Sequence, residues 1–459
     1  MRWFRHKDAD ENHIDFQSPD WFDQYIALRK THPVVPDIPD PAQLGFSETA
    51  PQGAGSWGNP LYSLLLHSGL IYGFPFLYPF KPAPPDKPGT RWATKLLLID
   101  TILYGGLEKQ TGLQPNSTAY SQALDQVALH IRGYYQGIMQ AHNGESGHSI
   151  EYLLGHRVTF YRNWLDWRKS GINTHLFWDW YFFIQYLDIV AQGHQLGQED
   201  FKKLLERKKA MKWLTMQFII AAAHCDSQIK RRERVLQHHF EKSSHFFTPR
   251  EIERLQVLFR DGLKLAHLQV PDLNWTARRY LLDISLLVVY ADREIHESED
   301  AYLHELLAKL DLQEQDLIES QLALGGFLLR FGQKIPFLSG RKSSLALIGR
   351  ALTHNLHKMR KATGAEVTET RDMALTLGRL LQHQLGINKS QGLPSEEEIA
   401  AAFDQIKDLP KFLPFFSLVF FPVPGITEMY ILLAYSIERL SGETIRLLPS
   451  NFSKMVKGK

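Results

Sequence analysis

Cysteine is almost absent from this chain, and no targeting signal is evident. Cys225 is the sole cysteine among 459 residues, so no disulfide within the chain and no cysteine-rich metal site can form. A reducing compartment is the natural setting for such a sequence. Residues 1–8 contain no apolar core of the kind that a secretory signal carries, and the residues that follow are acidic, unlike a transit peptide. These features predict a cytoplasmic protein.

Recognisable catalytic motifs are lacking too. The sequence has no Gly-x-Ser-x-Gly elbow, no His-Glu-x-x-His pair and no dinucleotide-binding fingerprint followed by a suitable acid. The segment 340–343, Gly-Arg-Lys-Ser, is similar to the end of a phosphate-binding loop. However, Arg341 separates the glycine from the lysine, and the upstream glycine spacing fails. We therefore expect a protein that acts by binding, and only the first 200 residues leave an enzymatic role open.

Excess charge of either sign is also missing. The chain has 52 Lys and Arg against 50 Asp and Glu, a formal net charge of +2, so any affinity for a polyanion must come from local patches. No DNA binding is predicted. Residues 330–361 contain no acid and can contact phosphates, and 202–212 with 230–232 form a second basic zone. For both segments a solvated helix face is the alternative interpretation.

A long apolar segment is present but is interrupted. From 412 to 435 the only charged side chain is Glu428. Pro422, Pro424 and Gly425 break the run near its centre, because proline lacks a backbone donor and disfavours helix in the preceding residue. Each half then has roughly ten helical residues, about 15 Å, against a hydrocarbon core of about 30 Å. We expect a helical hairpin over 412–440 that does not span a membrane.

This C-terminal segment resembles the ribosome-binding domain of the LETM (leucine zipper and EF-hand transmembrane) family. The residues that carry the likeness are a hairpin with a proline corner and an acid, then a terminal Leu-Pro-Ser-x-Phe: Pro414, Phe415, Pro424, Glu428, Leu448, Pro449, Ser450 and Phe452. The resemblance implies binding to a ribosome. The basic side chains ahead of it are candidate phosphate contacts, namely Arg341, Lys342, Arg350, Lys358 and Arg360. The transmembrane helix of the mitochondrial members is not evident, and an ordinary C-terminal hairpin packed on the core is the alternative.

The middle of the chain contains an internal repeat. Residues 216–240 align with 282–306 at a single offset, and both copies share Asp-x-x-Ile-x-x-x-Glu. An apolar helix is predicted before each motif, over 213–225 and 279–291, and a further helix after it. A third helix is then predicted to open at Thr248-Pro249-Arg250-Glu251 and at Gln313-Glu314-Gln315-Asp316. The pattern indicates a duplicated three-helix unit.

That duplication resembles the TerB-like fold of tellurite-resistance proteins, which has two acidic loops. The family resemblance implies a divalent cation, calcium or magnesium, near Asp226, Glu233, Asp292 and Glu299, since hard cations take oxygen ligands. Both loops lack the glycine of the family. The alternative is that each Asp forms a turn and each Glu interacts favourably with the dipole of a helix N-terminus.

These inferences combine into a mainly α-helical, all-α, multidomain protein. Residues 1–90 are expected to be a proline-rich extended arm, and 91–205 an aromatic-rich helical domain whose rings pack in the core. The further predicted parts are a TerB-like domain (206–325), a basic helical connector (326–395) and a LETM-type domain (396–459). The closest combined match is to the bacterial LETM-related, biofilm-associated proteins. The expected partner is a ribosome or another RNA-protein surface, and the alternative is a peripheral protein of the inner membrane, on an anionic surface, in ion homeostasis or stress response.

Overall fold

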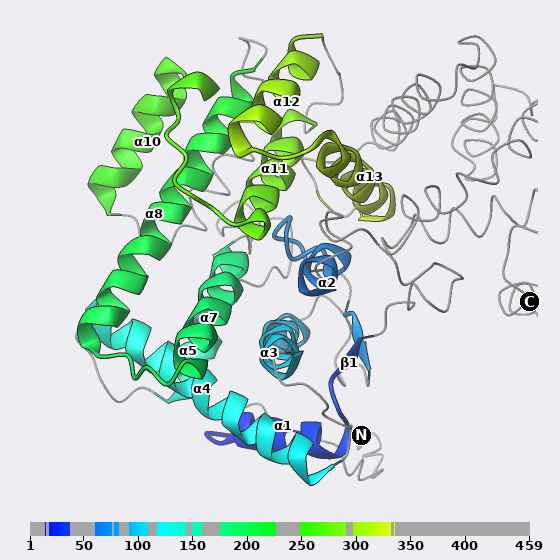
Figure 1. The fold of residues 1–459 in the computed structure, drawn as a ribbon, viewed down its shortest axis with the longest axis vertical. Helices are drawn as coiled ribbons and strands as arrows, with labels where there is room; N and C mark the ends of the chain where they lie inside the picture. Colours follow the sequence, from blue (N-terminus) through cyan, green and yellow to red (C-terminus); the bar gives the residue numbers. More distant parts are fainter. Residues whose placement is uncertain are drawn as a thin grey trace, which may run out of the picture. The chain divides into compact units, whose positions relative to one another are not determined.

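The fold is known from a computed structural model. The structure describes residues 14, 18–36, 60–75, 78–81, 91–108, 117–143, 149–157, 175–225, 248–290, 297–331 and 335. In this part of the chain the fold is mainly α-helical, with one two-stranded sheet (Figure 1), as the sequence predicts. The described residues fall into two compact units. The predicted domain over 396–459 and nearly all of the connector over 326–395 lie outside them.

The first unit holds the described residues of Met1–Asp37, Ser68–Leu214 and His239–Ile252. Its elements are α1 (Trp21–Thr31), β1 (Val35–Pro36), β2 (Phe80–Lys81), α3 (Arg91–Glu108), α4 (Thr118–Asn143), α5 (Ile150–Arg157), α7 (His175–Ala191) and the first part of α8 (Gln198–Ala223). Helix α3 packs against α4 and α7, and α1 packs against α4. The strands β1 and β2 are antiparallel, with Val35 opposite Lys81.

Helix α4 shows why these segments are helical. Its buried side chains include Leu124, Val127, Ile131, Tyr134 and Ile138, which recur every three or four residues and therefore form one apolar stripe. Helices α3 and α4 both lie within 91–205, the segment predicted to be helical, and confirm that part of the prediction.

The aromatic-rich segment contributes a buried helix. In α7 the rings of Phe177, Trp178 and Phe183 are at most 1% exposed, and Trp178 meets Tyr181 edge to face at 5.4 Å. Rings in such pairs stabilise a core beyond their burial alone. The prediction of core packing is confirmed for these residues, whereas Tyr152 in α5 is 47% exposed.

The expectation of an extended arm over 1–90 is wrong for part of that segment. The proline-rich stretches do include the extended pairs at β1 and β2, but α1 and α2 (Pro60–Ser68) are helical. No proline lies between residues 20 and 32 or between 61 and 74. In α1, Trp21, Phe22, Tyr25 and Ile26 are buried, so the helix is stabilised by one packed face.

The second unit holds the described residues of Ile38–His67, Thr215–His238 and Glu253–Lys459. Its elements are α2, the last part of α8, most of α10 (Pro249–Asp261), the short 3-10 helix η3 (Leu265–His267), α11 (Trp275–Val289), α12 (Glu297–Leu310) and α13 (Glu314–Phe331). Helix α11 packs against α12 and α13. From Tyr280 to Tyr290 every side chain of this segment is buried, so α11 is the central helix of the unit.

The predicted repeat agrees with the helix boundaries. Helices α8 and α11 end at Ala223 and Val289, 66 positions apart. The predicted third helices begin at Pro249 and Glu314. The start of α10 is a capping box, in which the Thr248 N–H donates to Glu251 Oε2 at 2.7 Å and the Glu251 N–H donates back to Thr248 Oγ1 at 3.3 Å. At the start of α13, the Gln313 N–H donates to Asp316 Oδ2 at 2.9 Å.

Candidate functional site

Most of the residues predicted to bind a partner or a cation lie outside the described part of the chain. This applies to Asp226, Glu233 and Asp292, to every basic residue from 341 to 361, and to the whole segment 412–452. Glu299 is in the first turn of α12, which is the helical position that the repeat predicts. Within the described residues, no group of three or more His, Cys, Asp or Glu side chains could hold a metal ion. The predicted cation site therefore stays a prediction.

Among the described residues, no helix is both long enough and apolar enough to cross a bilayer. The hairpin predicted over 412–440 lies beyond those residues. Its predicted inability to span a membrane stays a prediction.

Buried charged clusters are the most distinctive chemistry of the described residues. In the first unit, Arg29 of α1 and Asp100 of α3 form an ion pair, with side chains 1% and 0% exposed. The guanidinium Nε donates to Asp100 Oδ1 at 3.2 Å, and Nη2 donates to Oδ2. Removing two charges from water is costly, so such a pair is stable only when its remaining hydrogen-bonding capacity is also satisfied.

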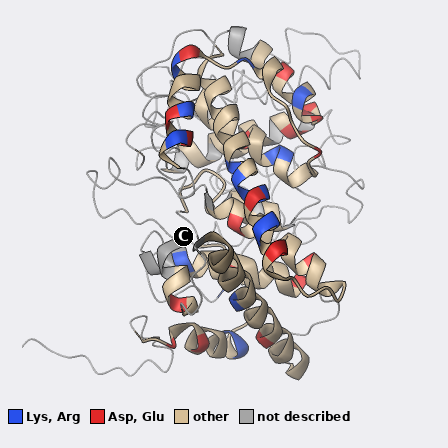
Figure 2. Cartoon of the chain, turned by 90° about the vertical axis from the view of Figure 1, so that its left-hand side faces the viewer, with Lys and Arg blue, Asp and Glu red and all other residues tan. Residues whose placement is uncertain are grey.

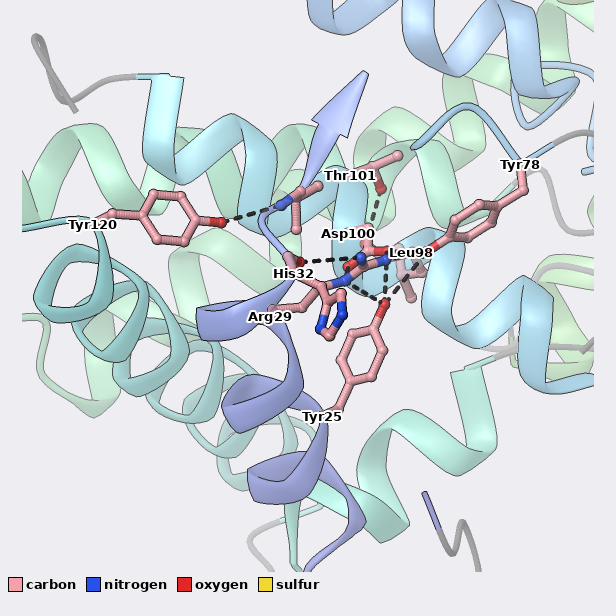
Figure 3. A network of polar contacts seen from close by, with 9 residues as sticks. Tyr25, Arg29, His32, Tyr78, Leu98, Asp100, Thr101 and Tyr120 are labelled. Atoms are coloured by element: carbon pink, nitrogen blue, oxygen red, sulfur yellow. Dashed lines mark hydrogen bonds and ion pairs between the residues drawn. The ribbon is translucent and has the colours of Figure 1, made fainter. Parts of the chain in front are cut away.

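Two tyrosines supply those further hydrogen bonds (Figure 3). The Tyr25 hydroxyl donates to Asp100 Oδ2 at 2.7 Å, and the Tyr78 hydroxyl donates to the same oxygen. Arg29 Nη2 in turn donates to the Tyr78 hydroxyl at 2.9 Å. This cluster joins α1, α3 and the residue two positions before β2 into one connected network.

The network changes the proton affinity of its members. Burial raises the pKa of Tyr25 and of Tyr78 well above the usual value, and the Asp100 carboxylate raises both further. Burial alone would lower the pKa of Arg29, but Asp100 holds it above its usual value. Both tyrosines are therefore neutral donors and Arg29 is charged at any ordinary pH. The arrangement joins helices through two neutral hydroxyl donors and one charged guanidinium.

A second buried pair lies in the same unit. Lys208 of α8 pairs with Asp179 of α7, with side chains 1% and 0% exposed. The Lys208 ammonium also lies 5.8 Å from the ring centroid of Tyr134, which is a cation–π contact. This pair attaches α8 to the aromatic helix α7.

The Lys208 pair changes the interpretation of the basic zone over 202–212. Lys208 and Lys212 are 1% and 4% exposed, so neither presents its charge to solvent. Lys202 and Lys209 pair with Glu199 and Glu206 at 2.7 and 3.1 Å. Figure 2 shows Lys and Arg interleaved with Asp and Glu on the described helices. This zone is therefore not a continuous surface for phosphate binding.

The third cluster lies in the second unit, around Arg279 of α11. Its side chain is fully buried and meets Asp283 at 3.5 Å and Asp316 at 3.3 Å. Tyr62 of α2 donates a hydrogen bond to Asp283 Oδ2, and Trp275 Nε1 donates to Asp316 Oδ1 at 2.9 Å. Two carboxylates thus share one guanidinium away from water.

Sequence reasoning missed all three clusters, although a signal for them exists. Asp100 and Asp283 are single acids inside otherwise apolar helical runs, and Arg29 lies one turn after Tyr25 on an apolar helix face. A charge at a core position must be paired. Arg279 and Asp283 are one turn apart in α11. The other partners cannot be chosen from the sequence, because they lie in other segments of the chain.

Comparisons of the chain with protein-family models, curated proteins and solved structures gave no match. The LETM and TerB-like resemblances accordingly stay hypotheses drawn from the sequence motifs.

Proposed function

We propose that this protein is a non-enzymatic binding protein that associates with ribosomes, or with a similar RNA-protein surface, through residues 326–459. The sequence of that segment supports the proposal. An acid-free basic block over 330–361 precedes the Leu-Pro-Ser-x-Phe sequence at 448–452, and RNA affinity requires local positive charge in a chain of net charge +2.

The observation that supports the choice of this segment concerns 202–212, the described part of the other basic zone. Lys208 forms a buried ion pair with Asp179. Lys202 and Lys209 form ion pairs with Glu199 and Glu206. The block over 330–361 has no acid within it to neutralise it. Of the two basic segments, it is the one whose composition suits phosphate contacts.

The test is cosedimentation of the full-length protein with ribosomes at several salt concentrations. We expect cosedimentation at low salt and release as salt rises, because log affinity falls by about 0.7 to 0.9 per log unit of salt for each phosphate neutralised on simple nucleic acids. Charge reversal to Glu at Arg341, Lys342, Arg350 and Lys358 should weaken binding and reduce the salt dependence.

A matched control reverses the same number of charges in the described helices, at Lys202, Lys203, Lys209 and Arg260. These substitutions change net charge equally but should leave cosedimentation close to that of the unmodified protein. An equal loss of cosedimentation from both sets of substitutions would indicate that the protein binds ribosomes by nonspecific electrostatic attraction. The proposal is contradicted if the folded protein stays at the top of the gradient at low salt. Flotation of the protein with anionic vesicles in the same preparation would then favour a membrane surface as the partner.

A further inference from the structure

We draw no further inference here: the strongest candidate, the half-buried apolar face of α10 around Leu258 and Phe259, carries no proposal because nothing in the described part of the chain shows what covers the remainder of that face.

Discussion

Tyr62 and Asp283 are 221 positions apart in the sequence and are joined by a hydrogen bond in the second unit. This contact attaches a helix from the N-terminal 90 residues to the central helix α11. In the first unit, Arg29 and Asp100 perform the same task for α1 and α3. In both units a buried carboxyl group accepts a hydrogen bond from a tyrosine of an N-terminal helix.

The Arg29 and Asp100 pair should be sensitive to loss of one partner. We expect Arg29→Met to destabilise the first unit by about 3 to 5 kcal/mol, because it leaves the Asp100 carboxylate buried without its counter-charge. Replacing both residues with apolar ones should cost less than either single change. Hydrogen exchange of α1 and α3 amides in the full-length protein measures the effect.

The control for that experiment is Arg132→Met. Arg132 pairs with Asp23, but their side chains are 29% and 69% exposed. Exposed pairs contribute about 0 to 1 kcal/mol, so this variant should be close to the unmodified protein. Similar losses of stability in the Arg29→Met and Arg132→Met variants would mean that the burial of Arg29 and Asp100 has no energetic consequence.

Alkaline pH should weaken the first unit through Tyr25 and Tyr78. Their pKa values are raised in the folded state, so the stability they confer is complete below the unfolded value of about 10 and is lost as pH rises above it. An ultraviolet titration should show tyrosinate from these two residues only as the unit unfolds. Tyr25→Phe should therefore leave the absorbance change unchanged over the pH range in which the protein is still folded. A smaller native absorbance change in that variant would show that Tyr25 ionises in the folded protein.

Gly137 on α4 should tolerate no side chain. A Cβ at this position would lie 2.3 Å from the Phe201 ring, so Gly137→Ala should separate α4 from α8. We expect a loss of about 1 to 3 kcal/mol, typical of overpacking, measured by denaturant unfolding. At Gly197 a Cβ would come no closer than 3.8 Å to its neighbours, so Gly197→Ala is the matched control. Equal stability of the two variants would contradict the close approach of α4 and α8.

The predicted cation site can be tested by thermal unfolding with millimolar calcium or magnesium. If Asp226, Glu233, Asp292 and Glu299 bind such an ion, the metal should raise the melting temperature, since a ligand at 100 times its dissociation constant adds about 2.7 kcal/mol. The double variant Asp226→Ala, Asp292→Ala should lose the response. An unchanged melting curve for the unmodified protein would leave these residues with turn and capping roles.

The sequence alone determined the local structure of several of the described helices. The segment that contains α4 was predicted to be helical, and the Thr248-Pro249-Arg250-Glu251 sequence predicted where α10 begins. The offset between the two repeat copies matched the ends of α8 and α11. These features depend on neighbours within a few residues, so periodicity and capping suffice to predict them. Helices α1 and α2 were missed because the prolines around them masked two short apolar faces.

Only the tertiary structure decided which charges are buried and which residues they meet. Lys208 lies at helical spacing from the buried Leu204 and Met211, but its pairing with Asp179 cannot be read from its neighbours in the chain. The partners Arg29 and Asp100, or Tyr62 and Asp283, are brought together by helix packing over long sequence separations. Burial and pairing depend on that packing, because the energy of a charge is set by what surrounds it in space and not by its neighbours in the chain.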